Sequence, residues 1–259
     1  MLAGPSTALA ANRNVTIAGS QFSPGRTITI AGDTVRWENR DFTPHNVTHD
    51  LFSSGSLSRL ETFEHDFHAA GVFDYHCTIH FGMRGSVEVY DVYLAPPPGS
   101  ILFGKAVVLR GLARQASEVI VQRVADGSTI GTATAGSEGS FAVSLAGSGP
   151  SFQVRAVEGA YVSRAVKILI RPKLTITARR VGSRHLVTVT ATPRQAGAKV
   201  AIERSTGLGW KRLARSSLNG ASKASLRISV TGTARIRARI TRAVGGYAPG
   251  LSGTIRVRG

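Results

Sequence analysis

The chain has 259 residues but only one cysteine, Cys77, and no apolar run near the ~20 residues that a membrane helix needs. A single thiol excludes an internal disulfide framework. Charged residues make up only 18% of the chain, whereas glycine occurs 29 times. Threonine, serine and valine are also frequent. Such a composition favours β-strands joined by tight turns over helices.

Charge is divided unevenly along the chain. Residues 1–94 contain six Arg, no Lys and ten acidic residues, a formal net charge of −4. Residues 95–259 contain 26 basic and five acidic residues, a net charge of +21. We expect this basic part to favour an anionic cell-wall or membrane surface. Nucleic acid is a weaker candidate because no nucleic-acid-binding module is visible. The alternative is that arginine only solvates the surface.

Short alternating segments separated by turn residues recur along the whole chain, which predicts an all-β fold. Three consecutive prolines, Pro96 to Pro98, break the pattern and act as a stiff spacer. We predict an antiparallel sandwich over 12–94, a Pro-rich linker at 95–98, and two immunoglobulin-like β-sandwiches. The first of these covers residues 99–172, and the second, basic one covers residues 173–259.

The first eleven residues are rich in alanine and contain a small-x-small pattern at Ala8 and Ala10. This pattern resembles a signal-peptidase site, but no basic segment precedes it. We interpret residues 1–11 as a signal-peptide remnant or as a flexible N-terminus. The first interpretation predicts an extracytoplasmic location, such as the periplasm, the cell surface or the secreted fraction.

The chemistry is concentrated in the segment Cys77-x2-His80-x2-Met83, which lies between two predicted strands. A short loop brings a thiolate, an imidazole and a thioether towards one point. A second imidazole comes from His45, about 30 residues upstream. Two imidazoles and one thiolate with a weak axial thioether form the ligand set of a blue-copper site.

These residues resemble those of the plastocyanin and amicyanin group of cupredoxins, and the Cys-x2-His-x2-Met spacing is similar to that of amicyanin in particular. The resemblance covers about a third of the chain. It implies a Greek-key sandwich that binds one Cu(I)/Cu(II) ion, with His45, Cys77 and His80 as equatorial ligands and Met83 as the axial ligand. It also implies an electron carrier with a redox partner protein, and not an enzyme.

Other positions gain roles from the same resemblance. Asn46 is expected to donate its backbone N–H to the Cys77 sulfur and to tie its side chain to Thr78. Ile79 stands where many members of the family have proline, so we expect its N–H to give the sulfur a second hydrogen bond and to raise the reduction potential. The residues expected to form an apolar docking patch around His80 are Pro44, Phe81 and Gly82.

Alternatives remain at the level of sequence. A Cys/His2 set also suits zinc, although Met83 and Asn46 argue against it. A copper-capturing or wall-binding surface protein would have the same ligands and no redox partner. The remaining histidines of the first region are expected to be structural or solvated rather than part of a second metal site: His49, His65, His68 and His76.

Overall fold

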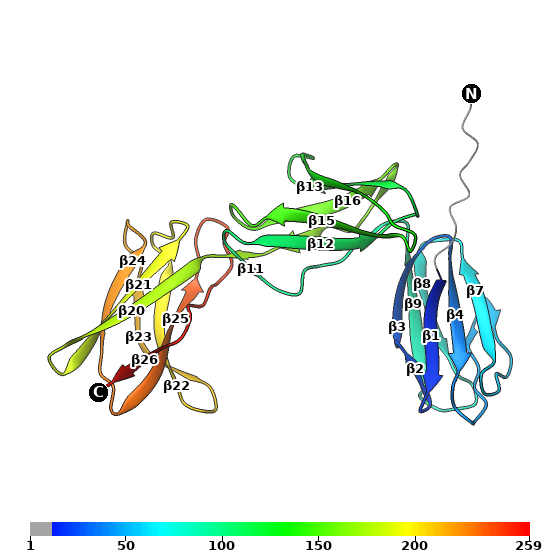
Figure 1. The fold of residues 1–259 in the computed structure, drawn as a ribbon, viewed down its shortest axis with the longest axis horizontal. Coiled ribbons are helices and arrows are strands. Elements are labelled where there is room, and N and C mark those ends of the chain that lie inside the picture. The colour runs from blue at the N-terminus through cyan, green and yellow to red at the C-terminus, as the bar shows by residue number, and fades with distance from the viewer. Residues whose placement is uncertain (1–11) are drawn as a thin grey trace. The chain divides into compact units, whose positions relative to one another are not determined.

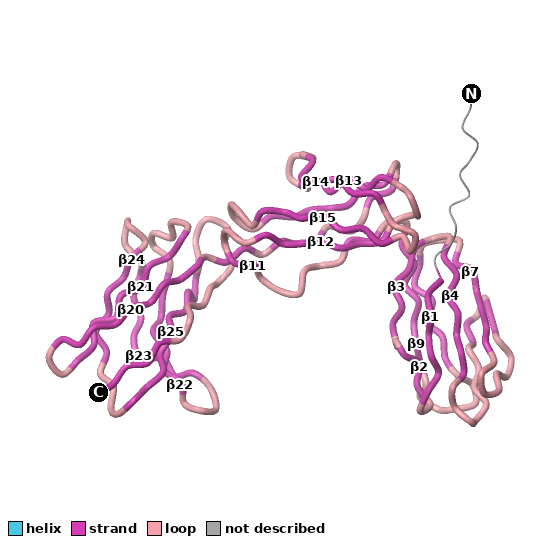
Figure 2. The backbone as a smooth tube through the Cα atoms, viewed as in Figure 1, coloured by secondary structure: helices cyan, strands magenta, loops and turns pink. Residues whose placement is uncertain are grey.

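The computed structural model describes residues 12–259. These residues form 26 β-strands and no helix (Figures 1 and 2). Consequently, this part of the chain contains no helix suited to cross a membrane. The all-β fold class is confirmed. The signal-peptide remnant expected at residues 1–11 lies outside the described residues.

Contacts divide the chain into two compact units. The first contains the chain up to Pro96 together with 108–144 and 153–166, and the second contains 97–107, 145–152 and 167–259. Both units take segments from residues 99–172. The division into three domains with a linker at 95–98 therefore stays a prediction.

The N-terminal region is a sandwich of two sheets (Figure 1). One sheet has the order β2-β1-β4-β7, with β1 Asn12–Ala18, β2 Gln21–Ser23, β4 Asp33–Asn39 and β7 Thr62–Phe67. The other has the order β3-β9-β8-β5-β6, with β3 Arg26–Ile30, β5 Thr48–His49, β6 Phe52–Ser53, β8 Gly71–His76 and β9 Arg84–Tyr90.

The predicted antiparallel pairing of this sandwich is wrong at two places. Strand β1 pairs with β4 in parallel, and β3 pairs with β9 in parallel. A parallel pair needs a long connection that crosses to the other sheet, and such crossings depend on the whole fold, not on local alternation. The short strands β2, β5 and β6 have only two or three residues each, too few to show an alternating pattern in the sequence.

Alternation nevertheless explains how the core forms. Strand β4 alternates buried and more exposed residues along its length, and it places Val35 and Trp37 in the core with no exposed surface. Tyr75 on β8 lies opposite Gly85 on β9, and a Cβ added at Gly85 would come within 2.5 Å of the tyrosine ring. Only glycine leaves room for the Tyr75 ring, which packs edge-on against Trp37. Tyr75 lies two residues before Cys77 in the sequence.

The middle segment contains short strands in three sheets, of orders β10-β12-β15, β11-β19 and β14-β13-β16-β17, with β18 paired to β16. Their bounds are β10 Tyr93–Leu94, β11 Ile101–Leu102, β12 Ala106–Leu112, β13 Glu118–Arg123, β14 Thr129–Thr134, β15 Ser140–Ala146, β16 Phe152–Glu158, β17 Tyr161–Val162, β18 Val166–Ile168 and β19 Ile170–Arg171.

The C-terminal segment is another two-sheet sandwich around a core of aliphatic residues. One sheet has the order β20-β21-β24 and the other β23-β22-β25-β26, and the strand pairs are antiparallel. The bounds are β20 Lys173–Val181, β21 Arg184–Thr192, β22 Lys199–Ser205, β23 Trp210–Ser217, β24 Lys223–Ile228, β25 Thr233–Arg242 and β26 Ile255–Arg258.

Candidate metal centre

Two chain segments carry the predicted ligands to one end of the N-terminal sandwich. His45 lies between β4 and β5, where it forms an isolated bridge with Leu57. Cys77, His80 and Met83 lie in the connection between β8 and β9. That connection is closed by two backbone bonds, from Cys77 N–H to the Met83 carbonyl at 3.1 Å and from Met83 N–H to the His80 carbonyl at 3.4 Å.

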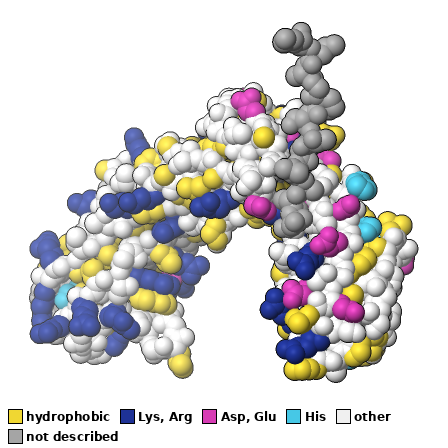
Figure 3. Space-filling model, turned by 45° about the vertical axis from the view of Figure 1, so that its right-hand side comes forward, with side chains coloured by type: hydrophobic (Ala, Val, Ile, Leu, Met, Phe, Trp, Pro, Cys, Tyr) yellow, Lys and Arg dark blue, Asp and Glu magenta, His cyan; other side chains and the backbone are white. Residues whose placement is uncertain are grey.

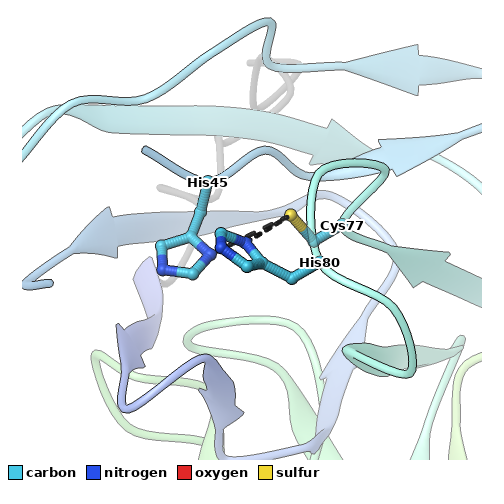
Figure 4. Close-up of side chains that lie close together, drawn as sticks. All are labelled: His45, Cys77 and His80. Carbon is cyan, nitrogen blue, oxygen red and sulfur yellow. Dashed lines mark hydrogen bonds between the residues drawn. The ribbon is translucent and has the colours of Figure 1, made fainter. Parts of the chain in front are cut away.

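Three donor atoms converge (Figure 4). The Cys77 Sγ atom lies 3.9 Å from His45 Nδ1 and 3.7 Å from His80 Nδ1, and all three donors lie within 4.8 Å of one another. His45 is fully buried and Cys77 is 4% exposed, whereas His80 is half-buried. The structure thus brings together a thiolate and two imidazoles in a site largely closed to water.

Met83 completes the soft donor set by its position. It is 5% exposed and belongs to the same core cluster as Cys77. A buried thioether beside a thiolate and two imidazoles suits copper better than zinc, which is normally closed by thiolate, imidazole or carboxylate ligands. The chemistry of the donor set therefore fits the predicted copper ion.

Asn46 connects the two ligand segments. Its backbone N–H points at the Cys77 sulfur at 3.4 Å. Its side chain donates to Thr78 Oγ1 at 2.6 Å and accepts from the Thr78 N–H at 2.8 Å. These three bonds hold the His45 segment against the Cys77 loop and so keep the donors close to one another.

Asp41 contacts one of the predicted ligands, and the sequence did not reveal this contact. Its Oδ2 atom lies 3.0 Å from His45 Nε2, and its carboxylate accepts the backbone N–H groups of Gly19 and Ser20 at 2.8 and 2.9 Å. Those two donors hold the pKa of Asp41 below its ordinary value. An ionised Asp41 favours a proton on Nε2 of His45, which leaves Nδ1 free to bind a metal.

The expected role of Ile79 needs correction. Within residues 12–259 the only backbone N–H that bonds to the Cys77 sulfur is that of Asn46. Ile79 is 49% exposed, and the N–H of its neighbour Thr78 bonds to the Asn46 side chain. The sulfur therefore has one backbone hydrogen bond and not two.

The residues predicted for partner docking are exposed. Phe81 has a relative exposure of 109%, Pro44 and Gly82 are also exposed, and Gly82 adopts a positive φ of 81° that places the turn. Phe42, which was not predicted, is 84% exposed and lies under the Arg59 guanidinium at 4.1 Å. Docking at this patch stays a prediction.

The other histidines of the region do not form a second group of metal ligands among the described residues. His49 stacks on Phe52 with ring centroids 5.0 Å apart, and His65 lies 4.4 Å from the same ring. Burial lowers the pKa of His65. These two side chains pack against aromatic rings.

A two-sheet sandwich with a His, Cys, His and Met set gathered at one end defines the cupredoxin class of proteins. Curated relatives share this region. Amicyanin from Paracoccus denitrificans is 36% identical over 29% of this chain and 63% of its own length. Amicyanin from Paracoccus versutus is 38% identical over 23% of this chain and 50% of its own length. Amicyanin-alpha from Methylorubrum extorquens is 35% identical over 31% of this chain and 73% of its own length.

Through its N-terminal region, the chain belongs to the amicyanin family. The chain spans less than two thirds of the length of the two Paracoccus relatives. A solved oxidised amicyanin mutant aligns at 30% identity with a TM-score of 0.29, over 33% of this chain and 94% of its own. A reduced Cu(I) form of another amicyanin mutant aligns at 32% identity with the same TM-score, over 30% of this chain and 81% of its own. No protein-family model matches the chain.

Proposed function

We propose that the N-terminal region is a type 1 copper site that carries single electrons to and from a redox partner protein. The observation that carries this proposal is the convergence of His45, Cys77 and His80 within 4.8 Å beside the buried Met83. Relatives named amicyanin support it. A bound copper ion would supply the one-electron couple between Cu(I) and Cu(II).

Residues of this region supply the ligands of the ion and keep those ligands in place. His45, Cys77, His80 and Met83 would hold the ion. Asn46 fixes the distance between the two ligand segments, and Asp41 orients the His45 ring. Because these groups are already held by hydrogen bonds and burial, the ligands need to move little when the electron arrives or leaves, which favours fast transfer.

The test is the visible absorption spectrum after addition of Cu(II). We expect an intense thiolate-to-copper band in the wild type, its loss in Cys77→Ala, and its loss or alteration in His80→Ala. His68→Ala is the matched control because His68 is exposed and outside the ligand group; its spectrum should equal that of the wild type. A wild-type protein without the band would contradict the copper site.

A second candidate is copper capture without electron transfer. The burial of three of the four ligands favours it, since a closed site also retains metal. Cyclic voltammetry separates the two functions. Reversible reduction supports electron transfer, whereas tight Cu(I) binding with slow, irreversible cycling supports capture.

For the rest of the chain we propose a positioning role. The region after the prolines would form two immunoglobulin-like modules, 99–172 and 173–259, that hold the copper domain at an anionic surface outside the cytoplasm. The charge of +21 over residues 95–259 supports this role. Cell fractionation tests the location, since recovery of the chain in the cytoplasmic fraction alone would contradict it.

A further inference from the structure

The cations of the C-terminal sandwich are concentrated on the outer face of the sheet β23-β22-β25-β26. Alternate residues of these strands, such as Val200, Ile236 and Val257, enter the core, so the residues between them point away from it. The register places Arg215 beside Ala201, and Ala201 beside Arg239. The residues that we call the basic face are Lys199, Arg212, Arg215, Arg235, Arg237, Arg239, Arg256 and Arg258.

The opposite sheet of the same sandwich is a built-in comparison. The outer positions of its centre form a hydroxyl-rich surface that includes Thr177, Thr188 and Ser225 in one row across the three strands. Its five outward cations are Lys173, Arg179, Arg184, Lys223 and Arg227. Both sheets come from one sequence of the same composition, so composition alone does not explain why arginine dominates one face. Figure 3 shows Lys and Arg side chains over the C-terminal part of the chain.

Almost no negative charge balances the basic face. Glu203 is the only Asp or Glu in residues 167–259. Its carboxylate is 9% exposed and is bound by Arg237 at 2.8 Å and Arg239 at 3.5 Å. Within the described residues no ion pair involves Lys199, Arg212 or Arg215. Their charges are available to an external anion.

A hollow of about 480 Å³ lies at these three free cations. Ala201 helps to form its floor, because its short side chain sits between longer neighbours. Ser216, Ser217 and Thr241 also line the hollow. Lys199 donates to Ser217 at 2.7 Å. The hollow therefore presents positive charge and hydroxyl groups, with no carboxylate in its lining.

We propose that the basic face binds a linear polymer of phosphate groups, with one phosphate seated in the hollow between Lys199, Arg212 and Arg215. The planar guanidinium group of arginine can donate two parallel hydrogen bonds to two oxygens of a phosphate group. Successive outward positions on a strand lie about 7 Å apart, and the cations extend over four strands. This spread suits a repeating chain of anions better than one small ion. The proposal deepens the positioning role proposed above and is independent of the copper site.

The test uses the full chain and long-chain inorganic polyphosphate. The face variant is Lys199→Ser, Arg212→Ser and Arg215→Ser together. The matched control is Lys173→Ser, Arg179→Ser and Arg227→Ser, which removes the same charges from exposed positions on the opposite sheet. We expect the face variant to bind at least tenfold more weakly and the control to bind nearly as the wild type does.

Salt dependence gives a second readout. Affinity of the wild type should fall steeply with salt, and the face variant should reduce the slope of log K against log salt by about 0.7 to 0.9, because the one phosphate seated in the hollow is no longer neutralised. A salt-independent affinity of the wild type would overturn the proposal. So would an equal loss of affinity in the two triple variants, which would show that only net charge matters.

Two further ligands test the chemistry. Polyglutamate of the same charge should bind more weakly than polyphosphate; equal binding would overturn the choice of phosphate.

Vesicles containing phosphatidylglycerol test a membrane as the partner. Leu208, with a relative exposure of 105% in the turn before β23, is the apolar side chain that such binding would use. Vesicle binding stronger than polyphosphate binding and lost in Leu208→Ser would overturn the proposal. In every arm the copper absorption band serves to show whether the copper site is intact, so failure here is separable from failure of the copper function.

Discussion

The copper-binding end of residues 12–94 and the basic face of residues 173–259 differ in how their side chains are arranged. In the first, a few side chains from two distant segments are buried and bonded to one another. In the second, many exposed side chains stand in rows that follow from strand alternation. A convergent, buried site should be sensitive to single substitutions, whereas a distributed, exposed one should respond to their sum. The predictions below test that contrast.

The largest single effect is expected at Asn46. Asn46→Ala removes both side-chain bonds to Thr78 and should lower the free energy of unfolding of the N-terminal region by about 2 kcal/mol. Copper should also dissociate faster. The measurement is urea unfolding of the metal-free chain, followed by the fluorescence of Trp37, the one tryptophan of this region, in a Trp210→Phe background.

Arg215→Ala is the matched substitution on the basic face. Its side chain is exposed and has no ion-pair partner among residues 12–259, so it should change stability by less than about 0.5 kcal/mol. Equal losses in Asn46→Ala and Arg215→Ala would break the contrast between the two regions.

Glu203 is expected to be the exception on the basic face. Glu203→Gln removes the one negative charge that balances Arg237 and Arg239 and should cost about 1 kcal/mol at low salt. High salt should recover part of the loss, because it screens repulsion among the exposed arginines. Hydrogen exchange of the β22 and β25 amides measures the local effect; protection that is unchanged at low salt would contradict it.

A smaller effect is expected from pH. The Arg26 side chain bonds to Glu88 and, with Tyr90, lowers the pKa of this carboxyl from 4.5 to about 2. A depressed pKa stabilises the folded state above pH 4.5, and the contribution fades as pH falls towards 2. Because Arg26 is 56% exposed, solvent screening keeps the contribution below about 1 kcal/mol.

The free energy of unfolding of the metal-free chain, measured as the pH falls from 4.5 towards 2, checks this prediction. Glu88→Gln should lose the contribution at neutral pH and show a correspondingly smaller fall in stability on acidification. A steeper fall in the variant would contradict the role of the Arg26–Glu88 pair.

The smallest effect is expected at Ile79. Since its N–H does not bond to the Cys77 sulfur, Ile79→Pro removes no hydrogen bond from the ligand and should leave the reduction potential unchanged within error. Cyclic voltammetry of the copper-loaded variant is the measurement. A clear fall in potential would restore the two-bond hypothesis that the sequence suggested.

Much of the fold was readable because local patterns and tertiary structure agree. Strand-length segments over 62–67 and 106–112 are visible in the sequence and coincide with β7 and β12, since one face of each strand is more buried than the other. The parallel pairs and the two-residue strands were not readable, because they depend on where the chain crosses between sheets. Likewise, Gly85 looks ordinary until Tyr75 is placed over it.

The sequence by itself determined the chemistry of this protein: one thiolate, a nearby imidazole and thioether, an upstream His45, and a division between an acidic and a basic part. Residue types and short spacings settle these features, because they need no knowledge of distant contacts. Only the tertiary structure decided that Asp41 orients His45, that Ile79 stays away from the sulfur, and that the cations gather on one sheet face. Each of these depends on strand register and on loops that meet in space, and a linear pattern does not encode such distances.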